Sequence, residues 1–409
     1  MIFFSSIIGA KISNISLNKI CIIPLYIYLL FHINKKPKIS TDVIPLLLFY
    51  LTSVISAILS LTAPYSSIQG YTSRSVMYLV QTLFIYIPLA ILIYNYHAKQ
   101  EILESSKSAA VFTYRINILF ALLEFFSFFL VNTTLSNGIL KLFYGIDNAS
   151  ALINLGSLGI FLRPTGLNMD PAYFGIILTI GIIFEKKKIW KWIGMFVAII
   201  SMSRTAIIIV IVLYIYEIIR KKNILMVSKE AVISISAVLF AITLLLLKSS
   251  NISSQIAGLL ARFNIFSESQ SADYGTLRHL VYIPKSIEVF ITQFNPIQML
   301  FGFGPRQSGT IIANSHIMDN YLNAEMFKMP WTIECDISEL LLGYGIVGLI
   351  LYYVNVFSLK NYGDDGRKLL IVIFLYSIMY DISSSTIAVL FIMIYKCCNV
   401  HSEVIDCRV

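Results

Sequence analysis

Three arginines lie in short polar interruptions of an otherwise apolar chain, and their chemistry suits phosphate. Arg163 stands in "FLRPTGLNMDPAYFG" (161–175), Arg204 in "SMSRTA" (201–206) and Arg278 in "TLRHLVYIPKSIEVF" (276–290). A guanidinium is always charged and offers forked donors that match phosphate oxygens. Such groups would stabilise the charge that develops on a phosphate or pyrophosphate leaving group, with no metal required.

Arg163 and Arg204 also have simpler interpretations. Arg163 can form a plain ion pair with Asp170, and Asp170 before Pro171 is typical of a helix start, because Asp caps free amides and Pro fits the first turn. Arg204 can anchor in lipid headgroups. Its neighbours are Ser and Thr, however, and not the Trp or Tyr that usually accompany such anchors.

Arg278 belongs to a long polar segment in which most charges are expected to be solvated surface. We favour it over Arg262 and Arg306 because its own segment has helical periodicity. That periodicity places apolar residues on one face, which would dock on the membrane domain: Leu277, Val281 and Ile287.

The bulk composition indicates that these residues work in a membrane. Of the 409 residues, 57% are hydrophobic and 13% charged, whereas a soluble domain carries about a quarter charged residues. Since each helical crossing needs roughly 20 apolar residues, the sequence predicts an all-α polytopic membrane bundle of about eleven (ten to twelve) transmembrane helices. The apolar runs are 19–33, 43–62, 75–95, 110–131, 172–185, 189–202, 205–219, 230–247, 338–357, 368–382 and 385–396.

Basic loops set the expected orientation, because Lys and Arg are retained on the cytoplasmic side. They fall in alternate loops: "NKKPKIS" (34–40), "EKKKIWK" (185–191), "RKKNILMVSK" (220–229) and "KNYGDDGRK" (360–368). The net charge of +9 is therefore largely a topology signal, and no nucleic-acid partner is implied. The C-terminus is expected in the cytoplasm, and segments 132–171 and 248–337 on the outer side, together with the three arginines.

This topology divides the chain into three expected parts. Residues 1–247 would form the first eight membrane helices, 248–337 an outer loop or cap that carries helices, and 338–409 the last helices and a cytoplasmic tail. The five cysteines have neither disulfide nor metal spacing, so no metal and no cofactor are expected. Arginines gathered on one face would suit a lipid-linked phosphate or pyrophosphate.

Two acids fall inside apolar runs: Glu124 near the middle of one run, and Asp381 near the outer end of another. Ionisable groups at such depth are costly, which makes each a candidate for function. For Glu124 the alternative is a protonated carboxyl bonded to a neighbouring helix.

The order of these features resembles the bacterial O-antigen and capsule polysaccharide polymerases, which are relatives of the O-antigen ligases. The resemblance covers about 150 to 357. It is carried by "RPTGLNMDPAYFG", "SMSRTA", "TLRHLVYIPKSIEVF", "MLFGFG" and "DISELLLGYGIVGLILYY", in that order.

The resemblance implies a metal-independent glycosyltransferase of the membrane-embedded class C type. It would join undecaprenyl-pyrophosphate-linked oligosaccharides, both donor and acceptor, on the periplasmic face of the bacterial inner membrane, with a chain-length regulator protein as a further partner. Arg163, Arg204 and Arg278 would hold the pyrophosphate of the donor. Asp336 or Asp170 would take the proton from the acceptor hydroxyl, because a general base must be a carboxylate or imidazole within hydrogen-bond reach.

One departure bears on the choice between polymerase and ligase. Ligases of this group carry a His shortly before the "GYGIVG"-like stretch, whereas here Asp336 stands nearest that position and His316 lies further upstream. The departure favours a polymerase, with His316 kept as a third candidate base. A ligase, a lipid-linked oligosaccharide transporter (flippase) and a non-catalytic assembly protein remain alternatives, although a transporter typically has internal repeats and mid-membrane sites.

Overall fold

The structure is a computed structural model, and it describes most of the helical part of the chain. The described residues are 22–33, 41–62, 70–131, 160–168, 171–201, 203–221, 274–317, 332–380 and 386–398, with short pieces at 11–12, 15–16, 68, 152–154 and 383.

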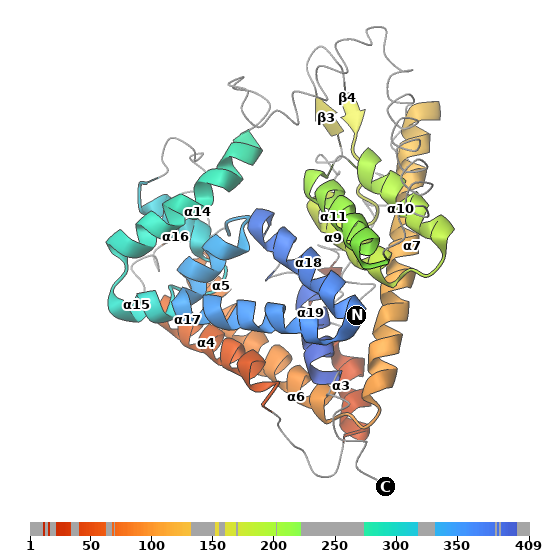
Figure 1. The fold of residues 1–409 in the computed structure, drawn as a ribbon. Coiled ribbons are helices and arrows are strands. Elements are labelled where there is room, and N and C mark those ends of the chain that lie inside the picture. Colours follow the sequence, from red (N-terminus) through yellow and green to blue (C-terminus); the bar gives the residue numbers. More distant parts are fainter. Residues whose placement is uncertain are drawn as a thin grey trace. The chain divides into compact units, whose positions relative to one another are not determined.

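Helices dominate this described part (Figure 1). They are α3 (Ile22–Phe31), α4 (Ile44–Leu61), α5 (Tyr71–Gln81), the π-helical turn η2 (Thr82–Tyr86), α6 (Ile87–Asn95), α7 (Lys99–Val131), α9 (Pro171–Phe184), α10 (Lys188–Ile200), α11 (Arg204–Lys221), α14 (Tyr274–Gln293), α15 (Pro296–Phe301), α16 (Ser308–Asn314), α17 (Asp336–Ser358), the 3₁₀ turn η7 (Leu359–Asn361), α18 (Gly363–Met379) and α19 (Thr386–Cys398). Two short antiparallel pairs accompany them: β1 (Lys11–Ile12) with β2 (Ile15–Ser16), and β3 (Leu152–Asn154) with β4 (Ile160–Leu162).

The helices agree with the predicted apolar runs. Every run except 230–247, which lies outside the described residues, overlaps a described helix. Four stretches are long and apolar enough to cross a membrane, at 44–61, 71–95, 99–128 and 336–361, and three shorter apolar helices lie at 22–31, 171–184 and 387–398. The chain is therefore a helical membrane protein by length and composition, while the total of about eleven crossings stays a prediction.

The chain forms two compact units. Unit 1 comprises residues 1–21 and 106–274, and unit 2 comprises 22–105 and 275–409. This division follows packing, whereas the division predicted at 247 and 337 follows membrane sidedness, which packing does not test.

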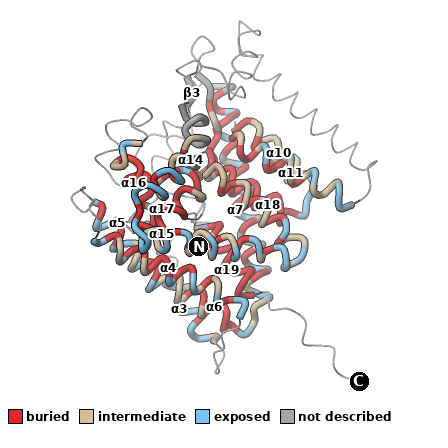
Figure 2. The backbone as a smooth tube through the Cα atoms, turned by 60° about the vertical axis from the view of Figure 1, so that its left-hand side comes forward, coloured by how far each residue is buried: buried red, intermediate tan, exposed pale blue. Residues whose placement is uncertain are grey.

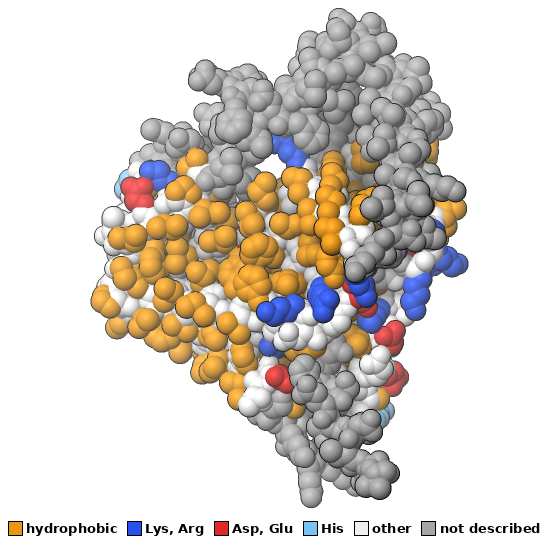
Figure 3. Space-filling view, in the orientation of Figure 1, with side chains coloured by type: hydrophobic (Ala, Val, Ile, Leu, Met, Phe, Trp, Pro, Cys, Tyr) orange, Lys and Arg blue, Asp and Glu red, His pale blue; other side chains and the backbone are white. Residues whose placement is uncertain are grey.

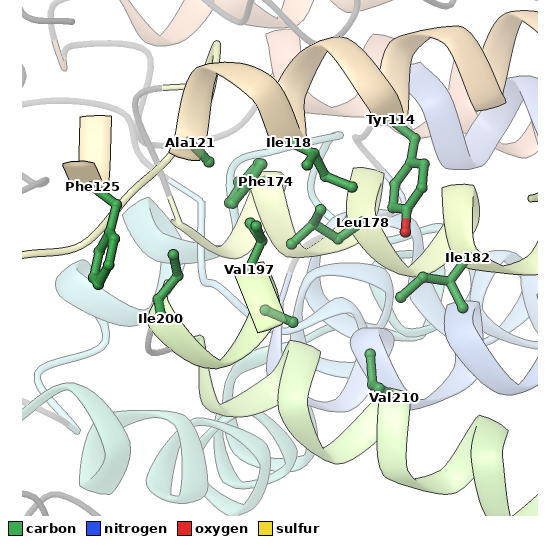
Figure 4. Close-up of a cluster of buried hydrophobic side chains, with 11 residues drawn as sticks. Tyr114, Ile118, Ala121, Phe125, Phe174, Leu178, Ile182, Val197, Ile200 and Val210 are labelled. Atoms are coloured by element: carbon green, nitrogen blue, oxygen red, sulfur yellow. The ribbon is translucent and has the colours of Figure 1, made fainter. Parts of the chain in front are cut away.

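Unit 1 has a core of apolar side chains from α7, α9, α10 and α11 (Figure 4). On α9 the residues Phe174, Leu178 and Ile182 recur every four positions, so they lie on one face and meet Tyr114 and Ile118 of α7. The hydroxyl of Tyr114 donates to the carbonyl oxygen of Trp190 at 2.7 Å, which ties α7 to the start of α10.

Unit 2 is built around α4 and α17, which pack along each other. The ring of Phe49 on α4 stacks with Tyr344 at 5.5 Å and contacts Tyr352 at 5.7 Å. Buried and exposed residues alternate along α4 (Figure 2). The exposed stripes are apolar and cover the face of Figure 3 over these helices, as expected of surface that meets lipid: Ile44, Leu48, Leu51 and Ile58 on α4, and Ile346, Ile350, Val354 and Phe357 on α17.

Helix α17 is interrupted at Gly345, whose φ of 69° and ψ of −174° are not helical. The carbonyl oxygens of Leu342 and Gly343 are instead bonded from outside the helix, by the backbone N–H groups of Phe303 and Gly304 at 2.9 Å each. The hydroxyl of Ser56 on α4 also donates to the carbonyl of Gly343. Because an unsatisfied backbone group is costly in a membrane, the break depends on these bonds. They join "MLFGFG" to "LLLGYG", two motifs that lie apart in the sequence.

Candidate functional site

Two of the three predicted arginines come to the same turn of unit 1. Arg163 follows β4, and its Nε donates to the carbonyl oxygen of Ser201 at 3.3 Å. Ser201 caps the end of α10, and Arg204 begins α11 three residues later. Both arginine side chains are partly exposed. The tight turn predicted from "SMSRTA" therefore contains Arg204, and its backbone binds the guanidinium of Arg163.

The loop that carries Arg163 is held by two fully buried side chains of α7. The Oε2 atom of Glu124 accepts the backbone N–H groups of Thr165 at 2.9 Å and Gly166 at 3.0 Å. Asn117, seven residues earlier and thus two turns along the same face, accepts the N–H of Leu167 at 3.0 Å. Glu124 was a candidate for function because of its depth. The structure gives it the role of a positioning residue for the loop, because its carboxyl group accepts two backbone amides.

An apolar groove of about 150 Å³ lies between α10 and α11. On α11, Ile207, Ile211 and Tyr214 follow Arg204 at spacings of three and four, so all four positions share one helical stripe. The groove lining is Met195, Ala198 and Ile199 from α10, with Ile207, Val210, Ile211 and Tyr214 from α11. A cationic turn one helical turn away from an apolar groove can hold a phosphate that is attached to a hydrocarbon chain.

The third predicted arginine, Arg278, lies in α14, and its side chain falls outside the described residues. The buried face of α14 includes Tyr282, Ser286 and Val289. Ile287 is 43% exposed, so its predicted place on the docking face is wrong. The face of α14 that packs is a neighbouring one, because the buried residues 282, 286 and 289 lie together on one side of the helix.

Asp336, the first candidate base, is the first residue of α17 and is fully buried. Its Oδ1 accepts the backbone N–H of Ser383 at 2.8 Å, and its Oδ2 accepts the hydroxyl of Tyr352 at 3.4 Å. The bond from residue 383 ties α17 to the segment between α18 and α19, whereas the bond from Tyr352 lies within α17. Action as a base would require the acceptor hydroxyl to reach this buried carboxylate.

The structure describes only one of the other candidate acids and bases. His316 is exposed at the end of α16 and has a left-handed backbone, with φ of 58°. Asp170 and Asp381 lie outside the described residues, so the predicted pairing of Asp170 with Arg163 stays a prediction. The helix start predicted there is confirmed, since α9 begins at Pro171.

Sequence reasoning missed the role of a further buried carboxylate, Glu339, which organises the loop at 304–308 in unit 2. Glu339 lies one turn into α17 and is fully buried. Its carboxylate accepts the backbone N–H of Arg306, and that of Ser308 at 3.4 Å. In each unit, therefore, a buried Glu accepts hydrogen bonds from the backbone amides of a loop that carries an arginine. The sequence signal that could have indicated this role is a Glu in the first turn of an otherwise apolar helix.

A charged pair in unit 1 has a structural role. Arg115 donates to both carboxylate oxygens of Glu185, from Nε at 2.7 Å and Nη2 at 2.8 Å. Burial disfavours the charged form of Glu185, but the bonds from Arg115 and the backbone N–H of Lys187 leave its pKa below the usual value of 4.5. The pair fixes the end of α9 against α7.

Among the described residues, no three His, Cys, Asp or Glu side chains are grouped to hold a metal ion. Comparison with known proteins finds no family model and no curated protein that matches the chain.

Proposed function

We propose that the protein is a membrane glycosyltransferase that joins oligosaccharides linked to undecaprenyl pyrophosphate into a polysaccharide, on the periplasmic face of the inner membrane. The proposal unites the motif resemblance with the geometry of unit 1. A ligase that moves a finished chain to another acceptor, and a flippase for the same lipid, are the competing functions.

The observation that carries the proposal is the junction of the arginine turn with the apolar groove. Arg163 binds the turn at 201–204 that carries Arg204, and the groove lies between the two helices that this turn joins, α10 and α11. A pyrophosphate needs guanidinium donors, whereas its isoprenoid chain needs apolar surface. Both requirements are met by neighbouring parts of one helical hairpin.

The reaction follows from these parts. The acceptor hydroxyl attacks the anomeric carbon of the donor sugar, a new C–O bond forms, and the bond to the pyrophosphate oxygen breaks. The electron pair of that bond goes to the pyrophosphate, whose growing negative charge the guanidiniums of Arg163 and Arg204 stabilise. The proton of the hydroxyl passes to a base, for which Asp336, Asp170 and His316 are the candidates. Arg278 is the third proposed phosphate ligand.

The positioning of Arg163 supports this role. Two buried side chains of α7, Glu124 and Asn117, use three backbone amides of the loop to fix it. Such preorganisation lets a guanidinium meet developing charge without rearrangement at the moment of reaction.

The test is complementation in bacteria that lack their own polymerase. Wild-type protein should restore a ladder of surface polysaccharide, and Arg204→Ala should reduce the rate of chain growth on the order of a hundredfold or more. Arg204→Lys should recover little, because a point charge cannot fork. Lys187→Ala, an exposed cation of the same unit, is the matched control. An unchanged ladder with Arg204→Ala at normal protein level would refute the site.

Two readouts separate the alternatives. A ligase would attach a chain supplied by another enzyme without lengthening it, so its product would be a single band. A flippase would move the lipid across vesicles and form no glycosidic bond. Labelling of cysteines introduced at 163 and 278 checks the sidedness, and reaction from opposite faces would remove the polymerase model.

A further inference from the structure

Unit 2 brings a second pair of arginines, which are far apart in sequence, to neighbouring positions on α5. Nη2 of Arg74 on α5 donates to the hydroxyl of Thr332 at 2.8 Å. That hydroxyl donates in turn to the carbonyl oxygen of Arg306 at 3.1 Å. Nη1 of Arg306 donates to the hydroxyl of Tyr78 at 2.7 Å, and its guanidinium lies over the Tyr78 ring, 5.5 Å from the ring centre. Arg74 and Tyr78 are four residues apart and so share a face of α5.

The fold holds Arg306 in a conformation that has a cost. Its φ is 59°, which L-residues rarely adopt and which is concentrated at functional sites. Glu339 stabilises this conformation by accepting the N–H of Arg306. The side chain of Glu339 therefore faces the backbone of the loop. The guanidinium of Arg306 is held at Tyr78.

The surroundings of the pair are those of a lipid contact. Immediately beyond Arg74, α5 and η2 expose a ridge of large apolar side chains: Val76, Met77, Val80, Leu83 and Phe84. These residues belong to the stretch 71–95, which is long and apolar enough to cross a membrane. The arginine lies in the first turn of that stretch, at the level expected for lipid phosphates. A π-helical turn follows at Thr82–Tyr86, a feature frequent at functional sites.

We propose that Arg74 and Arg306 bind the phosphate or pyrophosphate group of a membrane lipid, with the hydrocarbon chain against the apolar ridge of α5. This site is additional to the one formed by Arg163 and Arg204. Arg74 and Tyr78 share a face of α5, and Tyr78 holds the guanidinium of Arg306. Two guanidiniums on one helix face can share the oxygens of one phosphate. Because binding requires no bond to form, the site stands whether or not the protein joins sugars.

The experiment counts bound lipid on the full chain. The purified protein is placed in phosphatidylcholine nanodiscs with increasing undecaprenyl phosphate, and the bound lipid is measured at saturation by native mass spectrometry. The Arg163→Ala, Arg204→Ala double variant supplies a background in which the site of the proposed function has lost two of its three arginines. Adding Arg74→Ala or Arg306→Ala to it should weaken the remaining binding roughly tenfold or more. Lys285→Ala, a cation of the same unit paired with Glu288, is the control and should change nothing.

The outcomes are distinct from those of polymerisation. Retained lipid binding in the double variant, lost on substitution of Arg74 or Arg306, supports the site even if no polysaccharide is made. Equal binding with and without these substitutions overturns it. Inorganic pyrophosphate that binds as tightly as the lipid would overturn the lipid assignment, since the apolar ridge would then contribute nothing. If Arg74→Ala unfolds, Arg74→Lys keeps a donor for Thr332, and Tyr78→Phe releases the guanidinium of Arg306; unchanged binding in both overturns the proposal.

Discussion

Removal of the Glu124 carboxylate should free the loop that carries Arg163. In Glu124→Ala, the buried N–H groups of Thr165 and Gly166 lose their acceptor. Each buried donor left unsatisfied costs about 1–3 kcal/mol, so the loop should be destabilised by about 2–6 kcal/mol. In Glu124→Gln an amide oxygen remains, and only the gain from the charge is lost, about 1 kcal/mol for each bond and about 2 kcal/mol together.

Hydrogen exchange of peptides that span 163–168 measures this directly. A destabilisation of about 2 kcal/mol corresponds to roughly thirtyfold faster exchange. The Gln variant should show about that change, and the Ala variant at least as much. Asn117→Ala is the matched comparison, since it should expose the amide of Leu167 and leave those of Thr165 and Gly166 protected.

Chain growth should follow the exchange rates, because Arg163 is correctly placed only while the loop is closed. Glu288→Gln, on an exposed side chain of α14, controls for loss of an acid elsewhere. The reasoning fails if Glu124→Ala leaves exchange at 163–168 at the wild-type rate. It also fails if the loop opens while elongation continues unchanged.

Three further outcomes follow from the structure. Gly345→Ala should lower the melting temperature, because a β-carbon at a φ of 69° costs roughly 1–3 kcal/mol and would meet the backbone of Leu300; an unchanged melting temperature would mean that the break of α17 relaxes freely. The Arg115–Glu185 pair should stabilise the fold above pH 4.5, the usual pKa of Glu, and lose that contribution as the pH falls through the lower pKa of folded Glu185. The melting-temperature difference between wild type and Glu185→Gln should therefore shrink on acidification, and a constant difference would contradict the ionised pair. Asp336→Asn should fold, since an amide oxygen can still accept the N–H of residue 383, but should stop elongation in the ladder assay; normal chain lengths would assign the base to another residue.

The helices were predictable because their signals are local. Apolar runs located them, and the Pro at 171 and the short turn before Arg204 marked two starts that the structure confirms. The meeting of Arg163 with the turn at 201–204 agrees with the expectation that both arginines serve one site. It was not visible in either motif alone, since it depends on the hidden acceptors Glu124 and Asn117.

The second arginine pair was not predictable from the sequence. More than two hundred positions separate Arg74 from Arg306, and no periodicity links an α5 residue to a loop that follows α15. The different bonding partners of the two acids near the start of α17 were not predictable for a related reason. Asp336 and Glu339 lie one turn apart and both are buried, yet one binds the segment at 383 and the other the loop at 304–308. Only the partners that tertiary packing supplies distinguish them.

The backbone hydrogen bonds that join the segment around "GFG" (302–304) to the segment around "GYG" (343–345) affect how this architecture can be recognised in distant sequences. Bonds between backbone atoms do not depend on which side chains stand at Phe303 and Leu342, so other apolar residues can replace both. Gly302 and Gly345 cannot be replaced in the same way, because a β-carbon at either position would clash with the backbone of the other segment. Two Gly-x-Gly triplets, the second following an acidic helix start, should therefore persist where the arginine motifs around them have drifted beyond alignment.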